Sequence, residues 1–434
     1  MFLCLIVVSV PTGLAALGIV ALVLVASSLI GALIGPTPKY DLTDRKDLPP
    51  NDTERFLQVL EALSDAQVNK TGTLEVLTNG PSFYPAELEA IRNARQSVNI
   101  EAYIFQKGKI AEQYVEALTE RARAGVRVSL VLDAFGSAGT TNRYLAPLLD
   151  AGGKVGWYNG PRWHRLMHLD NRTHREMMIV DGRVGFIGGA GIADQWYSGT
   201  KGNPRWRDSA VRIEGEAVCN LQATFAENWL ASSGELLTGE AYFPSIRNDN
   251  PLVAMVVNST PTVGGGTRAR ILFQLLLASA RKGISITTPY FLPDKSLMSE
   301  LCRAVERGLR VRILVPGRKS DHLVTRSTSR AGYGKLLKAG AEVYEYQPSM
   351  IHAKVLCVDD LWVVVGSTNF DNRSFGINDE VNLAIRDAKV AMRFENDMAF
   401  DLEQSRRISL NEWEHRPVTE RATELMGLVF ERQQ

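Results

Sequence analysis

An internal duplication constrains the fold more than any other feature of this 434-residue chain. Four segments recur in the same order, separated by 178 residues (His174 and His352) to 188 residues (Leu148 and Leu336). The matching segments are 97–105 with 283–291, 124–133 with 307–316, 148–152 with 336–340, and 173–181 with 351–359. This separation predicts two related globular halves, because solenoid repeats have periods of only about 20–50 residues.

Each half carries the pattern of a strand, a helix, a strand, a helix, a strand and then a pair of strands. In the first half, residues 99–105 are rich in β-branched and aromatic side chains. Residues 110–124 have apolar side chains at helical spacing and end at Gly125, and 126–132 are mostly apolar. Alternation of strands and helices predicts an α/β fold, in which helices cover a sheet.

A hairpin is expected beside each motif histidine. Asp181-Gly182 stands between two apolar runs, which is a strong signal for a tight hairpin turn. His174 therefore precedes the first strand of a hairpin, and His352 has the same place before residues 355–358.

Charge and hydropathy separate the N-terminus from the rest. The 49 basic and 48 acidic residues nearly cancel, which argues against a protein that coats nucleic acid. No charge precedes Lys39, and residues 12–35 are long enough to cross a hydrocarbon core of about 30 Å as a helix. We expect a single-pass anchor within 1–35 in the cell (inner) membrane; a cleaved signal peptide is the alternative. Lys39, Arg45 and Lys46 follow the anchor and predict a cytoplasmic globular part.

These features predict four parts. They are an anchor (1–35), a linker and lead-in (36–74), a first domain (75–235) and a second domain (251–434) that ends in an amphipathic helix over 406–432. The linker prediction rests on the Pro- and Asp-rich stretch 36–50.

The second half contains residues suited to transfer a phosphoryl group. His352 and Lys354 are two positions apart, so they share a face of an extended strand. Ser367 and Asn369 are expected on the neighbouring strand. The imidazole would attack or carry a proton, the ammonium would neutralise charge, and the hydroxyl and amide would hold oxygens. A surface strand with an incidental His-x-Lys is the alternative.

With these motifs the sequence resembles the phospholipase D superfamily, whose mark is His-x-Lys-x4-Asp occurring twice, and within it the bacterial cardiolipin synthases. The resemblance rests on Pro289-Tyr-Phe-Leu-Pro293-Asp294, on residues 344–354 and on residues 366–380. It implies two duplicated phospholipase D-like α/β/α domains packed about a pseudo-twofold axis, with one active site between them.

The resemblance also implies an activity, that of a membrane-anchored phosphatidyltransferase. Such an enzyme joins two phosphatidylglycerol molecules through a phosphohistidine and releases glycerol, without a metal or cofactor. In the family the first-half histidine, here His174, is usually the nucleophile, and the other histidine protonates the leaving alcohol. Alternatives are a phospholipase D or phosphodiesterase acting on phospholipid or nucleic acid, and a catalytically impaired lipid-binding relative.

The first half departs from the motif. Glu176 stands where the family has lysine, and Gly191 stands where the second half has Asn369. The first site therefore keeps the imidazole of His174 and loses a cation and an amide. A glutamate repels a phosphate unless it is protonated or paired, so an impaired first motif is the alternative.

Other first-half residues are expected to bind substrate together with Glu176. Gly188 and Gly189 match the glycine-containing strand end of the second half. Arg172 precedes the motif histidine by two positions and Arg175 follows it directly. Either arginine is a candidate to pair with Glu176 or to bind the phosphate.

Four carboxylates are candidates for the catalytic machinery. Asp208 and Glu380 match the family's positions for acids that orient the two imidazoles. Asp181 and Asp359 keep the motif spacing, although both lie at hairpin turns, where a structural role is the alternative. Residues at strand ends that are expected to line the cleft are Glu101, Tyr103, Tyr290 and Asp294. His164 and His168 have metal-ligand spacing, but no matching acid or cysteine set follows them, so no metal is predicted.

Overall fold

The computed structural model describes residues 40–160, 171–200, 203–261, 267–321, 323–418 and 420–421. The first half runs to α7. Its elements are η1 (Arg45–Asp47), α2 (Glu54–Ser64), β1 (Val68–Thr78), α3 (Gly80–Asn93), β2 (Ser97–Ala102), α4 (Lys109–Arg123), β3 (Arg127–Asp133), α5 (Ala146–Asp150), β4 (Lys154–Tyr158), β5 (Met177–Val180), β6 (Val184–Gly188), α6 (Asp194–Tyr197), β7 (Ser209–Gly215) and α7 (Ala217–Ser233).

The second half repeats this series and adds short elements. Its elements are β8 (Pro251–Ser259), α8 (Arg268–Ser279), β9 (Gly283–Thr287), β10 (Phe291–Leu292), α9 (Lys295–Glu306), β11 (Arg310–Pro316), α10 (Leu323–Ala339), β12 (Glu342–Tyr346), β13 (Val355–Val358), β14 (Trp362–Gly366), β15 (Phe370–Asp371), α11 (Asn372–Gly376), β16 (Glu380–Arg386), α12 (Ala388–Glu403), β17 (Ser405–Ile408) and α13 (Leu410–Glu414).

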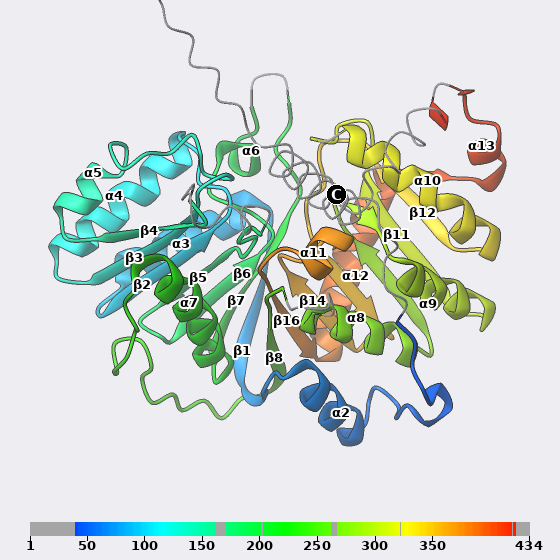
Figure 1. The fold of residues 1–434 in the computed structure, drawn as a ribbon, viewed down its shortest axis with the longest axis horizontal. Helices are drawn as coiled ribbons and strands as arrows, with labels where there is room; N and C mark the ends of the chain where they lie inside the picture. The colour runs from blue at the N-terminus through cyan, green and yellow to red at the C-terminus, as the bar shows by residue number, and fades with distance from the viewer. Residues whose placement is uncertain are drawn as a thin grey trace, which may run out of the picture.

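The order of the strands confirms the duplication. In the described part of the chain, one sheet of 15 strands has the order β17-β12-β11-β9-β13-β14-β16-β8-β1-β7-β6-β5-β2-β3-β4. From the antiparallel pair of β1 and β8 outward, each side passes through equivalent strands, and only β17 has no counterpart. Figure 1 shows the two halves side by side, with β1 and β8 between them.

Helices cover the sheet in the α/β/α arrangement expected from the sequence. In the first half, Val98 and Ile100 of β2 face the core shared with α3 and α4, whereas Asn99 bonds to Gln222 of α7 on the other face. In the second half, β9 and β11 pack on α8, α9 and α10. A third core contains residues of β5–β7 and of β13, β14 and β16 together with α7 and α12, so it joins the two halves.

The turn of the first-half hairpin shows why its sequence is Asp-Gly. Asp181 has φ 53° and Gly182 has φ 60°, the left-handed pair that a tight β-hairpin requires. A Cβ on Gly182 would collide with the carbonyl oxygen of Tyr242, so only glycine fits there. Strands β5 and β6 then form the predicted antiparallel pair, in which Met177 lies opposite Ile187 and Val180 lies opposite Val184.

The segments expected to join or follow the domains are more ordered than predicted. Residues 40–50 pack on the second half, where Arg45 forms an ion pair with buried Glu300. Residues 51–74 contain α2 and part of β1, which pairs with both β7 and β8, so the lead-in is central to the sheet. Instead of continuous helix, the start of 406–432 forms β17 and α13, and β17 pairs with β12.

The predicted anchor at 1–35 lies outside the described residues, as does the end of the predicted C-terminal helix. Within the described ranges no helix combines the length and the apolar character needed to cross a membrane.

Candidate active site

The two motif histidines meet where the halves join. His174 lies three residues before β5, and His352 lies three residues before β13. The backbone N–H of His174 donates to the carbonyl of Asp379 at 2.8 Å, and that of His352 donates to the carbonyl of Arg207 at 2.7 Å. Each histidine is therefore held by the backbone of the opposite half, which fixes the two rings relative to each other.

A buried carboxylate contacts each imidazole. Nδ1 of His174 lies 3.1 Å from one Glu380 oxygen and 3.2 Å from the other. Nδ1 of His352 lies 3.0 Å from Oδ2 of Asp208. Burial opposes ionisation of Asp208, but the hydrogen bond from His352, the charges of His352 and Lys354 and the N–H of Ser209 together outweigh it and lower the pKa of this carboxyl. With Nδ1 turned to the carboxylate, Nε2 is the atom of each ring that attacks phosphorus or carries a proton.

This pairing crosses between the halves. Asp208 belongs to the first half and orients the second-half histidine, whereas Glu380 belongs to the second half and orients the first. The sequence placed one acid after each motif but did not indicate the exchange.

Lys354 lies against the ring of His352, as their spacing predicted. Its Nζ is 2.9 Å from Nε2 and 2.7 Å from Nδ1 of His352, and it donates to the carbonyl of the same residue at 2.8 Å. Burial, and then the charge of Lys354, lower the pKa of His352 to about 4. Burial also lowers the pKa of Lys354 to about 8. At neutral pH the imidazole is therefore uncharged beside a protonated ammonium.

Both histidines open into a pocket of about 250 Å³ lined by residues of both halves. Arg172 comes from the first half and Arg373 from the second, so the pocket has guanidinium groups suited to an anionic phosphodiester. Asn369 lines it too, as predicted. Asp371 also faces it, and burial raises the pKa of this carboxyl to about 6.

Three residues predicted to bind substrate are absent from the lining of this pocket. Ser367 donates from Oγ to Glu380 at 2.5 Å, and its carbonyl lies 3.1 Å from Nδ1 of His174, so it holds the pair rather than a phosphate. A Cβ on Gly189 would lie 2.8 Å from Cδ of Lys354, so this glycine makes room for the lysine stem. Gly188 lines a different, smaller cavity.

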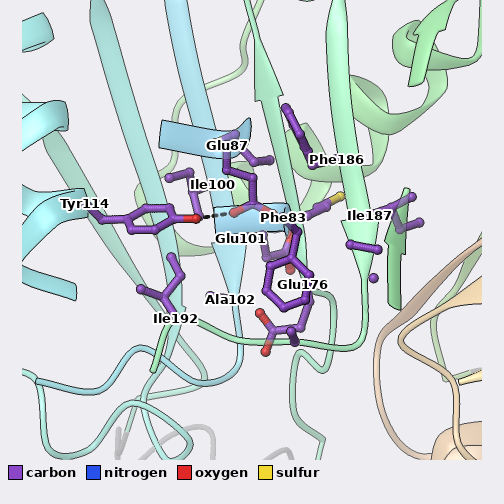
Figure 2. A pocket seen from close by; sticks show the side chains of 15 residues that line it. Phe83, Glu87, Ile100, Glu101, Ala102, Tyr114, Glu176, Phe186, Ile187 and Ile192 are labelled. Carbon is purple, nitrogen blue, oxygen red and sulfur yellow. Dashed lines mark hydrogen bonds between the residues drawn. The ribbon is translucent and has the colours of Figure 1, made fainter. Parts of the chain in front are cut away.

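Glu176 is buried and does not line the pocket of the histidines. One carboxylate oxygen, Oε1, accepts hydrogen bonds from the backbone N–H groups of Tyr103 and Ile104, each at 3.2 Å. Burial raises the pKa of Glu176 well above its ordinary value. Its side chain lines an internal cavity of about 30 Å³. Tyr114 and Glu87, which are hydrogen-bonded to each other, line the same cavity (Figure 2).

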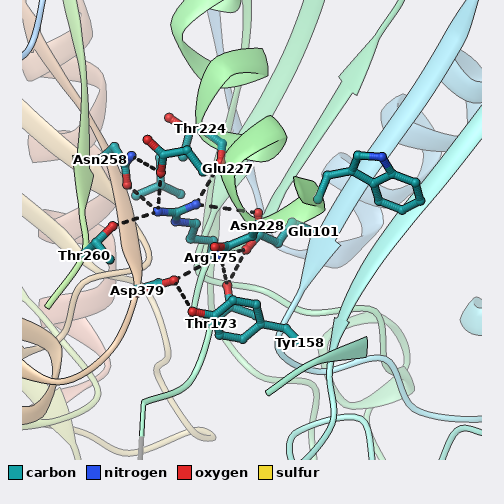
Figure 3. Close-up of polar contacts among 12 residues, drawn as sticks. Glu101, Tyr158, Thr173, Arg175, Thr224, Glu227, Asn228, Asn258, Thr260 and Asp379 are labelled. Atoms are coloured by element: carbon teal, nitrogen blue, oxygen red, sulfur yellow. Dashed lines mark hydrogen bonds and ion pairs between the residues drawn. The ribbon is translucent and has the colours of Figure 1, made fainter. Parts of the chain in front are cut away.

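Arg175 points away from the site, so it neither pairs with Glu176 nor reaches a substrate. Its guanidinium is fully buried and donates to the Thr224 carbonyl at 2.8 Å and to Glu227 at 3.2 Å. It also bonds to Asn258 of the second half, as Figure 3 shows. Arg172 is thus the arginine of this segment that faces the pocket.

The two motif aspartates are turn residues and not members of the cleft. Asp181 accepts hydrogen bonds from the backbone of residues 95–97, and Asp359 accepts them from residues 281–283. Each carboxylate therefore fixes the first residues of the strand beside its hairpin. These contacts support the structural role, which is the alternative that their place at hairpin turns offered.

Of the strand-end residues, Tyr103 and Tyr290 line the pocket, and Asp294 and Glu101 do not. Asp294 caps α9 and pairs with Arg270. Glu101 lies in the buried network around Arg175. His164 and His168 lie outside the described residues.

Three further residues line the pocket although they were not predicted to do so: Asp371, Arg373 and Asp321. Asp371 and Arg373 follow Asn369 at intervals of two residues, and this spacing was the available signal. Asp321 accepts a hydrogen bond from the Tyr290 hydroxyl at 2.7 Å, and no local motif marks it.

Known proteins resemble this chain over most of its length. The family model described as "Cardiolipin synthase, PLD-like domain" matches residues 88–229 and 274–402. Cardiolipin synthase 1 of Bacillus cereus is 33% identical over 388 residues, which cover 87% of this chain and 76% of that protein. The probable cardiolipin synthase YwiE of Bacillus subtilis (strain 168) is 31% identical over 403 residues, covering 90% and 79% respectively.

Solved structures share the fold. The phosphatidylserine synthase of Haemophilus influenzae Rd KW20 has a TM-score of 0.66 at 13% identity, and the match covers 87% of this chain and 100% of that one. The polyphosphate kinase of Porphyromonas gingivalis has a TM-score of 0.53 at 11% identity, covering 90% and 56%. At these identities the likeness concerns the fold alone.

Proposed function

This chain belongs to the cardiolipin synthase family of the phospholipase D superfamily and is a phosphatidyltransferase, and from that membership we propose that it joins two phosphatidylglycerol molecules into cardiolipin and releases glycerol. One observation carries the proposal. Two histidines, one from each half and each bonded to a buried carboxylate, line one pocket beside Lys354. This arrangement suits the exchange of one alcohol for another at a phosphodiester.

The exchange takes two steps. In the first, Nε2 of one histidine attacks the phosphorus of phosphatidylglycerol, a P–N bond forms, and the P–O bond to glycerol breaks as the other histidine gives its proton to the leaving oxygen. In the second, that histidine takes a proton from a hydroxyl of another phosphatidylglycerol. The resulting oxygen attacks phosphorus, the P–N bond breaks, and cardiolipin leaves.

His352 suits the attacking role. Burial and Lys354 lower its pKa to about 4, which keeps the ring unprotonated at neutral pH, as a nucleophile requires. His174 then carries the proton, which reverses the order usual in the family. Lys354 and the pocket arginines Arg172 and Arg373 oppose the negative charge that develops on the phosphoryl oxygens.

The membrane part of the proposal rests on the sequence. Residues 1–35 carry no charge and are long enough for one span. They would hold the enzyme in the cell membrane, with the globular part in the cytoplasm next to its lipid substrates. The cations that follow the segment support this orientation.

Lipid analysis tests the proposal. The full-length protein, expressed in bacterial membranes that lack cardiolipin, should produce cardiolipin and an equimolar amount of glycerol. His352→Ala and Lys354→Ala should each abolish production, because one removes a catalytic imidazole and the other removes the buried cation. The matched controls are His415→Ala and Lys338→Ala, since both of these side chains are exposed and neither lines the pocket.

Other products would change the conclusion. Phosphatidic acid in place of cardiolipin would show that water is the acceptor and that the protein is a hydrolase. Lipid binding without any product would show a non-catalytic relative. Full activity of His352→Ala would mean that the active site is elsewhere.

A further inference from the structure

The loop after β2 depends on Glu176 for its hydrogen bonds. Two consecutive N–H groups, those of Tyr103 and Ile104, both donate to Oε1 of Glu176. The two carbonyl groups of this loop have other partners: the Tyr103 carbonyl accepts from the Ser137 hydroxyl, and the Ile104 carbonyl accepts from the N–H of Ile192. Buried backbone donors need acceptors, and Glu176 supplies both.

This loop forms a wall of the catalytic pocket. Tyr103 and Ile104 line the pocket together with His174. The Tyr103 ring packs edge-on against the His174 imidazole, with centroids 5.2 Å apart and an interplanar angle of 61°. Movement of the Tyr103 backbone would therefore move a contact that limits the orientation of the imidazole.

The second half shows why a lysine is tolerated at the position equivalent to Glu176. In the duplicated alignment, residues 97–105 match 283–291, so Pro289 stands where the first half has Tyr103. Proline has no N–H group, and that position therefore needs no acceptor. Lys354, which corresponds to Glu176, instead turns to His352.

Gly191 is fitted to the same arrangement. It stands where the second half has Asn369, and a Cβ on it would lie 2.6 Å from the Ile104 carbonyl oxygen and 3.1 Å from Oε1 of Glu176. A side chain at this position would therefore displace the Glu176 contact. The first half thus differs from the second at Glu176 and at two positions that adjoin its carboxylate, Tyr103 and Gly191.

We propose that Glu176 is a positioning residue for the phosphatidyl transfer, which holds the Tyr103–Ile104 loop against His174, and that the first motif is rebuilt around a hydrogen-bond acceptor instead of being impaired by a lost cation. The inference rests on the proposed function of the pocket. Burial raises the pKa of Glu176, so a neutral acceptor satisfies the loop. A lysine in place of Glu176 would leave the N–H groups of Tyr103 and Ile104 without an acceptor, because an ammonium can only donate. It would also bring a second cation toward Lys354.

Three substitutions at this position separate acceptor, apolar and donor side chains. Glu176→Gln keeps a neutral acceptor and should retain most of kcat. Glu176→Met has similar length without an acceptor, and Glu176→Lys restores the family residue. Both should lower kcat by roughly 10- to 100-fold with little change in KM, because a misplaced catalytic group reduces turnover more than lipid binding. Glu89→Lys, an exposed change of the same charge on α3, is the control and should behave as wild type.

Rates are measured for the full-length enzyme in mixed micelles of phosphatidylglycerol and detergent, with thermal unfolding of each variant recorded in parallel. Tyr103→Ala, which removes the ring beside His174 and leaves the Glu176 contacts to the backbone, should lower kcat even if Glu176→Met does not fold. The rate of each variant is measured as the total phosphatidylglycerol consumed per unit time and is compared with the wild-type rate. The comparison therefore holds whether the product is cardiolipin or phosphatidic acid.

Three results would overturn the proposal. A gain in kcat for Glu176→Lys would show a handicapped first motif. Wild-type kcat for Glu176→Met would show that the acceptor is unnecessary. A Glu176→Gln variant as slow as Glu176→Met would show that the carboxyl itself moves a proton.

Discussion

Replacing Arg175 by methionine should destabilise the protein by roughly 3–5 kcal/mol, the cost of removing one partner from a buried charge network. The guanidinium is fully buried and donates to the Thr224 carbonyl and to Asn258. Buried hydrogen bonds to a charged group contribute about 1.5–3 kcal/mol each. Two such bonds therefore account for roughly 3–6 kcal/mol. The loss is limited because the neighbouring carboxyl of Glu101 can take up a proton once the Arg175 charge is removed.

A double substitution of Arg175 and Glu101 tests the same network in a second way. Burial raises its pKa to about 7, and the charge of Arg175 4.0 Å away works in the opposite direction. Without Arg175, this carboxyl becomes protonated at neutral pH or remains as an unpaired buried charge. Arg175→Met combined with Glu101→Gln should therefore lose less stability than the sum of the two single variants.

Urea unfolding of the full-length protein in detergent, followed by tryptophan fluorescence, measures the loss. The matched control is Arg310→Met, because Arg310 is 60% exposed and its ion pair with Glu342 lies at the surface. Such pairs contribute at most about 1 kcal/mol. If Arg175→Met were no more destabilising than Arg310→Met, the buried network would not hold the two halves together as the structure indicates.

Two further predictions concern the chemistry. The pKa of Lys354 is lowered to about 8 by burial, so kcat/KM of the free enzyme should fall as the pH rises through that value and the ammonium is lost. Lys354→Arg should be slower at pH 7 but should not show this fall, and an unchanged pH profile in this variant would exclude Lys354 as the titrating group. If His352 is the nucleophile, 32P-labelled phosphatidylglycerol should leave an alkali-stable phosphohistidine on His174→Ala and none on His352→Ala. Label on the latter variant alone would reverse the two roles.

Local patterns in the sequence predicted the outer strands and helices but missed the centre of the sheet. Strands such as β3 are apolar on both faces, because helices cover both sides of them. β1 is the central connection between the halves, yet it contains Lys70, Gly72 and Glu75 and lacks a continuous apolar run. β17 has the sequence Ser-Arg-Arg-Ile with exposed arginines, which is as compatible with a surface helix as with an edge strand.

Within the site, the sequence predicted contacts between near neighbours and failed where contacts are long-range. The spacing of His352 and Lys354 placed them together correctly. The partner of each imidazole is 144 or 206 residues away, and no periodicity specifies such a pair. Alternation also could not show that Ser367 turns to Glu380 while Asn369 reaches the pocket, because β14 ends at Gly366 and the strand geometry ends with it.

The exchange of carboxylates explains why the two motifs need not be alike. Because Glu380 orients His174 and Asp208 orients His352, neither half has a complete histidine–carboxylate pair of its own. A change in one motif therefore acts on a site to which both halves contribute. Glu176 leaves the carboxylate partner of His174 intact and is matched to the loop that it holds. One cation from Lys354, with arginines from both halves at the pocket, is then a sufficient source of positive charge for a phosphodiester.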